Sequence, residues 1–136
     1  MGRALLAYGE ARRTAVAEAR RELSLNELDA RALLFIVDSP GARPSDVRDH
    51  LGITSAGVTT LIDRLVQRGA VRRDLDTEDR RVNHITAIID LDAHPWSLLR
   101  AFDRSIERAI AALDPDEGAR VAHILERVVA EASRAG

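Results

Sequence analysis

The sequence contains no cysteine, and all twenty of its basic residues are arginine. The absence of cysteine excludes disulfide bonds, thiolate nucleophiles and a cysteine redox switch, and it is consistent with a reducing compartment. The absence of lysine, beside abundant alanine, indicates a GC-rich coding bias rather than a functional choice. Aromatic residues make up only 3% of the chain.

The sequence also lacks a long apolar run. The N-terminal segment is rich in alanine, but Glu10, Arg12 and Arg13 interrupt it. It therefore has the character of neither a signal peptide nor a membrane span. We expect a cytoplasmic protein that has no association with a membrane.

Motifs for catalysis or metal binding are missing as well. There is no nucleophile elbow, glycine-rich phosphate loop or paired catalytic motif, so we expect no enzyme, no catalytic residues and no cofactor. The histidines are widely separated along the chain. Asp46, Asp49 and His50 could be interpreted as a metal site, but a capped, charged helix explains them better, and we expect no metal.

Length and charge set further bounds. A chain of 136 residues with 46% hydrophobic content fits one domain, residues 1–136, whose core is easier to build if it is shared with a partner chain. The net charge of −2 is not typical of a DNA-binding protein. The distribution of charge is more informative, because several arginines follow one another at close spacing. They are Arg64, Arg68, Arg72, Arg73, Arg80 and Arg81.

The segment 44–54 predicts a short helix and a tight corner. Pro44 suits the first helical position, and Val47 and Leu51 share one face. Gly52 suits a left-handed helix end, and Thr54 is a good N-cap for a second helix. This order of elements is typical of a helix-turn-helix.

The second helix is predicted over residues 55–68, with one apolar face and one face of small or polar residues. The apolar face includes Val58, Leu61 and Leu65. A solvated surface is the commoner explanation for the other face. Because small side chains permit close approach to a groove and hydroxyls bond phosphates or base edges, we instead predict DNA contacts there. The predicted contact residues are Ser55, Ala56, Thr59, Thr60 and Arg64.

A β-hairpin is predicted next. Residues 70–73 form the first strand, residues 74–79 a polar turn and residues 80–86 the returning strand. Arg72, Arg73, Arg80 and Arg81 lie on this hairpin, and we predict that they contact DNA. Arg80 and Arg81 are the best candidates for the minor groove. Arg72 and Arg73 are expected to stay near the backbone or to pair with Asp74 and Asp76.

Three sequence segments resemble the MarR (multiple antibiotic resistance regulator) transcription factors. They are Leu51-Gly52-Ile53-Thr54, the run from Val58 to Val71, and Asp79-Arg80-Arg81-Val82. The resemblance implies a mainly α fold with a small β-hairpin wing, in which a winged helix-turn-helix of about residues 25–90 is combined with terminal dimerisation helices. It also implies a homodimeric regulator that binds double-stranded DNA and is often released by a small aromatic ligand.

The flanking segments are predicted to be helical. The dimerisation helices would span about residues 3–23 and 94–134. Ser24, Leu25, Asn26 and Glu27 are interpreted as a capping box that starts the next helix. A long amphipathic helix is predicted from Trp96 to Leu113, and Asp114 and Pro115 are expected to start the last helix. The apolar stripes of these helices exceed what a small core needs, which favours a second subunit over a monomer.

The sequence permits two interpretations of its aromatic residues and two of its function. Tyr8, Phe35 and Trp96 are predicted to line a pocket for a small aromatic effector, although core packing is the more common role of such residues. The alternative function is a winged-helix protein-interaction module that does not bind DNA. It is favoured by the acidic pI near 6.1 and by Asp63 on the exposed helix face.

Overall fold

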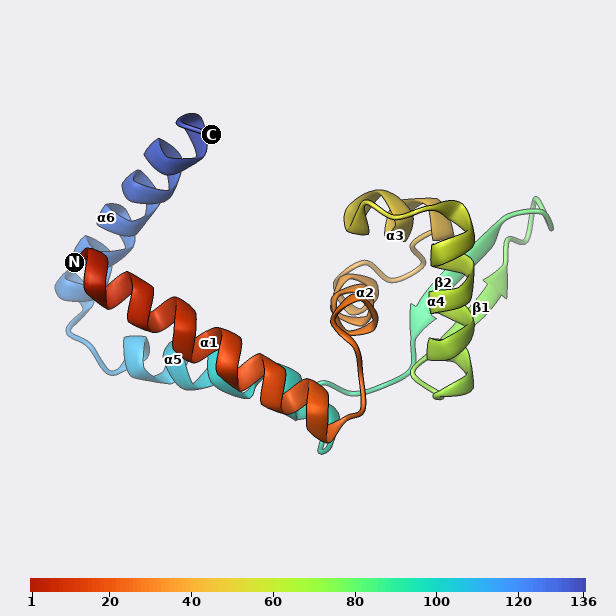
Figure 1. Cartoon of the computed structure of the whole chain (residues 1–136), viewed down its shortest axis with the longest axis horizontal. Coiled ribbons are helices and arrows are strands. Elements are labelled where there is room, and N and C mark those ends of the chain that lie inside the picture. The colour runs from red at the N-terminus through yellow and green to blue at the C-terminus, as the bar shows by residue number, and fades with distance from the viewer. The chain divides into compact units, whose positions relative to one another are not determined.

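The computed structural model describes residues 1–136, and it divides into two compact units, residues 1–99 and 100–136. The first unit contains α1 (Gly2–Glu22), α2 (Glu27–Asp38), α3 (Pro44–Leu51), α4 (Ser55–Gln67), β1 (Val71–Leu75) and β2 (Asn83–Ala87). The labelled helices and strands are drawn in Figure 1, and a 3-10 helix, η1 (Trp96–Arg100), includes the last residues of the first unit and the first residue of the second. The second unit contains α5 (Ala101–Ala111) and α6 (Pro115–Arg134). That both units form one functional domain stays a prediction.

The mainly helical fold with a two-stranded antiparallel hairpin is the predicted fold class. The core of the first unit is built where α2, α3, α4 and the hairpin meet. Its largest fully buried side chains are apolar, and they are Leu33, Ile36, Val47, Leu61, Ile62, Leu65, Val71 and Ile85. Burial of each such side chain contributes about 1.5–3 kcal/mol. None of the helices combines the length and apolar character of a transmembrane span.

The connection between α1 and α2 differs from the predicted capping box. Ser24 adopts a left-handed φ of 52°, its N–H donates to the Arg21 carbonyl at 3.1 Å, and the Leu25 N–H donates to the Arg20 carbonyl at 2.9 Å. These bonds close the C-terminal end of α1, and α2 begins only at Glu27, so Ser24 does not lie at the capping position of α2. Asn26 takes that role, since its side chain accepts from the Asp29 N–H at 2.8 Å.

The hairpin is shifted along the chain relative to the prediction. β1 and β2 pair from Val71 opposite Ala87 to Leu75 opposite Asn83. Arg80 and Arg81 lie in the turn and not in the predicted strand over residues 80–86. The reason is local, because the Asp76 and Asp79 side chains accept backbone N–H groups inside the turn and hold it outside the ladder.

The predicted long helix from Trp96 to Leu113 is likewise divided. It consists of η1 and then α5, and Arg100 at the junction has φ −116° and ψ 5°, outside the regular helical region. The start of α6 agrees with the prediction, because the Asp114 side chain accepts from the N–H groups of Asp116 and Glu117 and Pro115 follows as the first helical residue. No residue of α5 or α6 is buried within the chain.

Candidate nucleic-acid interface

The corner between α3 and α4 has the geometry that the sequence predicts. Gly52 ends α3 with a φ of 66°, in the left-handed region that glycine enters without steric cost. Thr54 caps α4 by accepting the Gly57 N–H at 3.0 Å. A Cβ added at Gly57 would lie 3.1 Å from this cap oxygen, so the small residue leaves room for the capped turn. The predicted helix-turn-helix corner is confirmed.

Helix α4 separates its side chains into two faces. Val58, Leu61, Ile62 and Leu65 are buried against the core. The side opposite the core is open and carries the exposed Ser55, Ala56, Thr59 and Thr60, and the fifth predicted DNA contact on α4, Arg64, is exposed as well. Since the buried face holds the helix in place, the exposed face is presented on a fixed support.

The threonine hydroxyls on this face are oriented by the helix backbone. Thr59 donates to the Ser55 carbonyl at 3.0 Å, and Thr60 donates to the Ala56 carbonyl at 3.1 Å. With the hydroxyl proton engaged, each oxygen is left as an acceptor on the outer surface. Thr60 also borders a shallow depression of about 390 Å³, together with the exposed Leu28 and with Ala56.

Arg64 is turned toward α2. Its Nε donates to one carboxylate oxygen of Asp29 at 3.0 Å, and its Nη2 donates to the other at 2.6 Å. Asp29 is buried, whereas the Arg64 side chain is 46% exposed. The hydrogen bond to Asp29 is the main reason that the pKa of Arg64 is raised, with desolvation acting in the opposite direction. This bidentate pair fixes α4 against α2, and the predicted DNA contact of Arg64 stays a prediction.

Arg68 is a second tie between α4 and the rest of the first unit. Its guanidinium donates to the Leu23 carbonyl, between α1 and α2, and lies 5.6 Å from the centre of the Trp96 ring. A cation over an aromatic face is a favourable arrangement. Arg64 and Arg68 therefore both attach the helix to its own chain.

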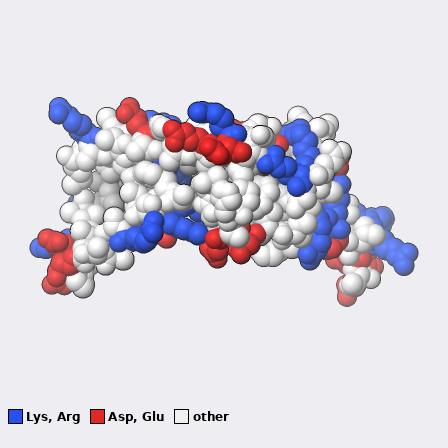
Figure 2. Space-filling model, turned by 90° about the horizontal axis from the view of Figure 1, so that it is seen from below, with Lys and Arg blue, Asp and Glu red and all other residues white.

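The arginines of β1 pair with carboxylates. Arg72 donates to Asp74 at 3.0 and 3.2 Å, as predicted. Arg73 pairs with Asp63 on α4 and not with either predicted partner, because strand β1 packs beside α4. Asp76, the other predicted partner, is bound to His84. Positive charge on this strand is thus largely balanced, and Figure 2 shows acidic and basic side chains interspersed on the face in view.

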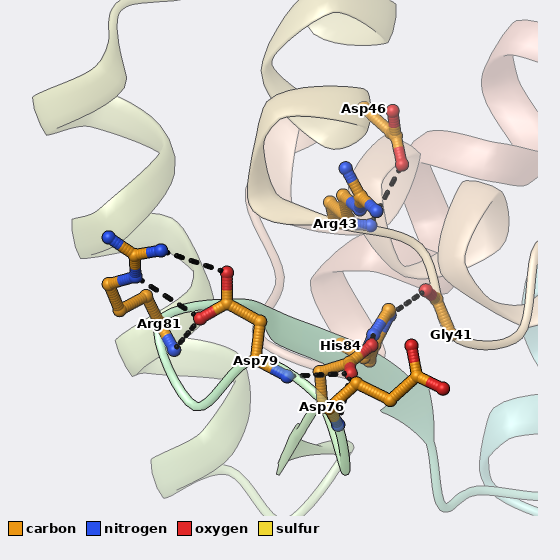
Figure 3. Close-up of polar contacts among 8 residues, drawn as sticks. Gly41, Arg43, Asp46, Asp76, Asp79, Arg81 and His84 are labelled. Carbon is orange, nitrogen blue, oxygen red and sulfur yellow. Dashed lines mark hydrogen bonds and ion pairs between the residues drawn. The ribbon is translucent and has the colours of Figure 1, made fainter.

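The turn of the hairpin carries two exposed arginines. Asp79 accepts from the Arg81 backbone N–H at 3.0 Å and from its side chain at 3.2 and 3.4 Å (Figure 3). This hydrogen bonding lowers the pKa of Asp79. The Arg81 side chain nevertheless remains 91% exposed, and the neighbouring Arg80 is exposed without an ion-pair partner. Both residues are open to an approaching phosphate.

His84 connects the turn to the α2–α3 connection. Its Nδ1 lies 2.8 Å from the Gly41 carbonyl oxygen, and its Nε2 lies 2.8 Å from the Asp76 carboxylate (Figure 3). In the sequence, His84 is only one of four widely separated histidines. No spacing rule could have found this pair, because it depends on the hairpin register and on the path of a distant segment.

The aromatic residues predicted for an effector pocket have different neighbours. Phe35 stacks on His50, with ring centroids 4.3 Å apart and an angle of 19° between planes. Trp96 lies beneath Arg68, and Tyr8 is 42% exposed on α1. None of them lines the groove of about 590 Å³ that lies beside α1 and α2. Their predicted ligand role stays a prediction.

The α1–α2 groove combines an apolar floor with a basic rim. Val16, Ala17, Ala30, Leu34 and Leu99 contribute apolar surface. The basic lining consists of Arg12, Arg13, Arg20 and Arg31, beside a single acid, Glu27. The Nε atom of Arg20 is buried without a hydrogen-bond partner. No cluster of three or more His, Asp or Glu side chains is arranged to hold a metal ion.

Comparison with known proteins finds a family model that matches part of the sequence and solved structures that have a similar fold. The sequence model of the MarR family matches residues 23–82. The structure is similar to YusO from Bacillus subtilis, with 20% identity over 93% of this chain and 89% of that one and a TM-score of 0.66. It is also similar to Streptococcus pneumoniae FabT in complex with DNA, with 19% identity over all of both chains and a TM-score of 0.67.

A third similar structure is a mutant of Staphylococcus aureus MepR bound to an oligodeoxyribonucleotide. It is 15% identical over 96% of each chain, with a TM-score of 0.63. No curated protein matches the sequence.

Proposed function

We propose that the chain, whose residues 23–82 match the sequence model of the MarR family, is a DNA-binding transcription regulator of that family, and more narrowly a repressor that binds a pseudo-palindromic operator as a homodimer. The observation that carries this proposal is the exposed face of α4, where small and hydroxyl side chains are supported from behind by a buried apolar face. A helix of this kind suits the major groove.

Homodimer formation is supported by the terminal helices. α6 buries no residue within the chain, yet Val121, Ile124, Val128 and Val129 give it exposed apolar surface. Leu5 and Leu6 do the same on α1. Exposed apolar surface of this extent is typical of an interface between subunits. A two-fold dimer would present two copies of α4 to successive major grooves, roughly 34 Å apart.

We assign base recognition first to Thr59 and Thr60. Their hydroxyl oxygens are available as acceptors, and the amino groups of adenine and cytosine are the matching donors in the major groove. Arg80 and Arg81 are assigned to phosphates or the adjacent minor groove, because both are exposed at the turn of the wing.

Selection of binding sites from a random duplex library tests the proposal. The expected product is an inverted repeat, and Thr60→Ala should change its sequence. Arg81→Ala should weaken binding to all sequences alike if Arg81 contacts phosphate, and should act more strongly at narrow A·T tracts if it enters the minor groove. Removal of one phosphate contact should reduce the salt slope by about one unit. Enrichment of no sequence, together with affinity that does not fall with salt, would overturn the proposal.

The second candidate function is a protein-interaction module. It is favoured by one observation, that Arg64, Arg72, Arg73 and Arg81 each already pair with a carboxylate of the same chain. The same salt titration distinguishes the two functions. Phosphate contacts require a steep loss of affinity as salt rises, whereas a mainly apolar interface does not.

An effector site is proposed in the α1–α2 groove. Arginines around an apolar floor suit a small aromatic acid, whose ring is buried while its carboxylate meets a guanidinium. Benzoate, as a probe, should release the protein from DNA, and the uncharged benzyl alcohol serves as the matched control. If both compounds release the protein from DNA equally well, or if neither releases it, the groove does not recognise an anion.

A further inference from the structure

His84 lies on β2 and bridges two segments that are far apart in the sequence. One ring nitrogen meets the Gly41 carbonyl in the α2–α3 connection, and the other meets the Asp76 carboxylate at the start of the wing turn, both at 2.8 Å (Figure 3). The side chains of His84 and Asp76 are 28% and 29% exposed. The ring is therefore enclosed enough to be held in place and open enough to exchange protons with solvent.

The two contacts determine the protonation state of the ring. A carbonyl oxygen and an ionised carboxylate only accept hydrogen bonds, so both ring nitrogens must donate. Neutral histidine has one N–H, and only the imidazolium has two. The complete arrangement therefore requires a positively charged His84.

Asp76 transmits this arrangement to the rest of the turn. Its second carboxylate oxygen accepts the N–H groups of Glu78 at 2.8 Å and Asp79 at 3.1 Å. Asp79 in turn holds the backbone and the guanidinium of Arg81. A continuous series of hydrogen bonds thus leads from His84 to an arginine that we assign to DNA.

Other charged groups lie near the His84 ring, on β1, at the start of α3 and at the end of α2. Asp74 is the cross-strand neighbour of His84, and it is paired with Arg72. Arg43 at the start of α3 opposes the charge on His84, and its backbone N–H is bound by Asp46. On the side of α2, Asp38 ends the helix before the Gly41 turn.

The balance favours the charged ring. The hydrogen bond to Asp76, followed by that to Gly41, raises the pKa of His84 above its ordinary value of 6.5. The bond to His84 is also the main reason that the pKa of Asp76 falls to about 2.

We propose that His84 is a positioning residue for DNA binding, whose doubly protonated ring holds the wing turn in place and whose deprotonation releases it. This inference rests on the proposed DNA-binding function. We call the two contacts of the His84 ring, with the Gly41 carbonyl and the Asp76 carboxylate, the clamp. Because the pKa of His84 is raised on folding, the clamp is complete below pH 6.5 and is lost as pH rises through the raised pKa. At the acid end it persists until the pH approaches about 2, where Asp76 becomes protonated.

The test combines a DNA-binding profile from about pH 6 to 9 with an NMR titration of the histidine rings in the free protein. The parent should bind its selected operator about tenfold more weakly at the alkaline end. His84→Gln should bind with the weaker affinity throughout and lose this pH dependence. His123→Gln, which changes an exposed histidine of α6, is the matched control and should behave as the parent.

Asp76→Asn gives an independent test, since it removes the carboxylate and should also abolish the pH dependence. The NMR titration of the parent should show both ring nitrogens of His84 protonated near pH 6 and a pKa above 6.5. A neutral ring near pH 6, or a pH dependence that survives in His84→Gln, would overturn the inference. Absence of DNA binding at every pH would instead refute the proposed function, and the NMR result would then report on the clamp alone.

Discussion

Helices α4 and α6 have similar amphipathic sequences but very different surroundings. α4 buries Val58, Leu61, Ile62 and Leu65 inside its own chain. α6 is longer and buries none of its residues, although Ile124 and Val128 lie on one apolar stripe. An amphipathic pattern indicates that a helix will cover one face, but it does not indicate whether the covering surface belongs to the same chain.

The difference separates two roles for apolar residues. In α4 the apolar residues are buried within the same chain, which leaves the opposite face of the helix available for a ligand. In α6 the apolar stripe itself is the available surface, and a second copy of the chain is the partner that we propose. Substitutions in the two helices should therefore affect different measurements.

The largest effect is expected for Ile124→Glu in α6. A two-fold interface repeats every substitution, so the loss of two buried side chains should weaken the dimer by roughly 3–6 kcal/mol, on the order of 100-fold or more in the dissociation constant. Ala130→Glu adds the same charge on the opposite side of α6 and should leave the dimer intact. Sedimentation over a dilution series measures both. An unchanged dissociation constant for Ile124→Glu would remove α6 from the interface.

The next largest effect is expected for Leu61→Ala in α4. This side chain is 1% exposed, and its truncation should lower the free energy of unfolding by about 2–5 kcal/mol. Thr60→Ala, at the adjacent exposed position, should change it by less than about 0.5 kcal/mol. Urea unfolding at a fixed protein concentration gives the comparison. Similar losses for the two variants would mean that α4 is not packed as described.

A smaller effect on stability is expected when the ion pair between Arg64 of α4 and Asp29 of α2 is removed. Arg64→Ala leaves the buried Asp29 carboxylate without its bidentate partner and should lower the free energy of unfolding by about 1–3 kcal/mol. Arg80→Ala removes an arginine that has no ion-pair partner and should have little effect on stability.

Combining Asp29→Asn with Arg64→Ala should recover part of the loss, because the buried charge is then gone. Fully additive losses in this double-mutant cycle would show that the two side chains do not interact in solution.

The smallest effects are expected for two glycine-to-alanine substitutions, which should change the free energy of unfolding in opposite directions. Gly52→Ala should lower the free energy of unfolding by about 1 kcal/mol, since its φ of 66° is strained for alanine although no atom lies within 4 Å of the added Cβ. Gly118→Ala in α6 also meets nothing within 4 Å, and it should raise stability by up to about 1 kcal/mol through helix propensity. Thermal unfolding of both variants is sufficient, and equal signs would contradict the assigned backbone conformations.

The sequence alone was sufficient for the features that depend on near neighbours. Pro44, Gly52 and Thr54 predicted the helix-turn-helix corner, and Asp114 with Pro115 predicted the start of α6. The apolar spacing of α4 predicted its buried face. Caps, turns and helical periodicity depend on residues only a few positions apart, so they can be predicted from the sequence alone.

Tertiary structure decided which charged groups meet and where the hairpin ends. Arg64 reaches Asp29 and Arg73 reaches Asp63 only because α4 packs beside α2 and β1. His84 finds Gly41 and Asp76 because one register of the hairpin brings its ring between them. Any of the twenty arginines could in principle pair with many acids, and the choice among them depends on distances that exist only after the core has packed. The sequence by itself therefore determined the helix-turn-helix corner, the buried face of α4 and the resemblance to a family, whereas the fold decided which arginines remain free for a ligand.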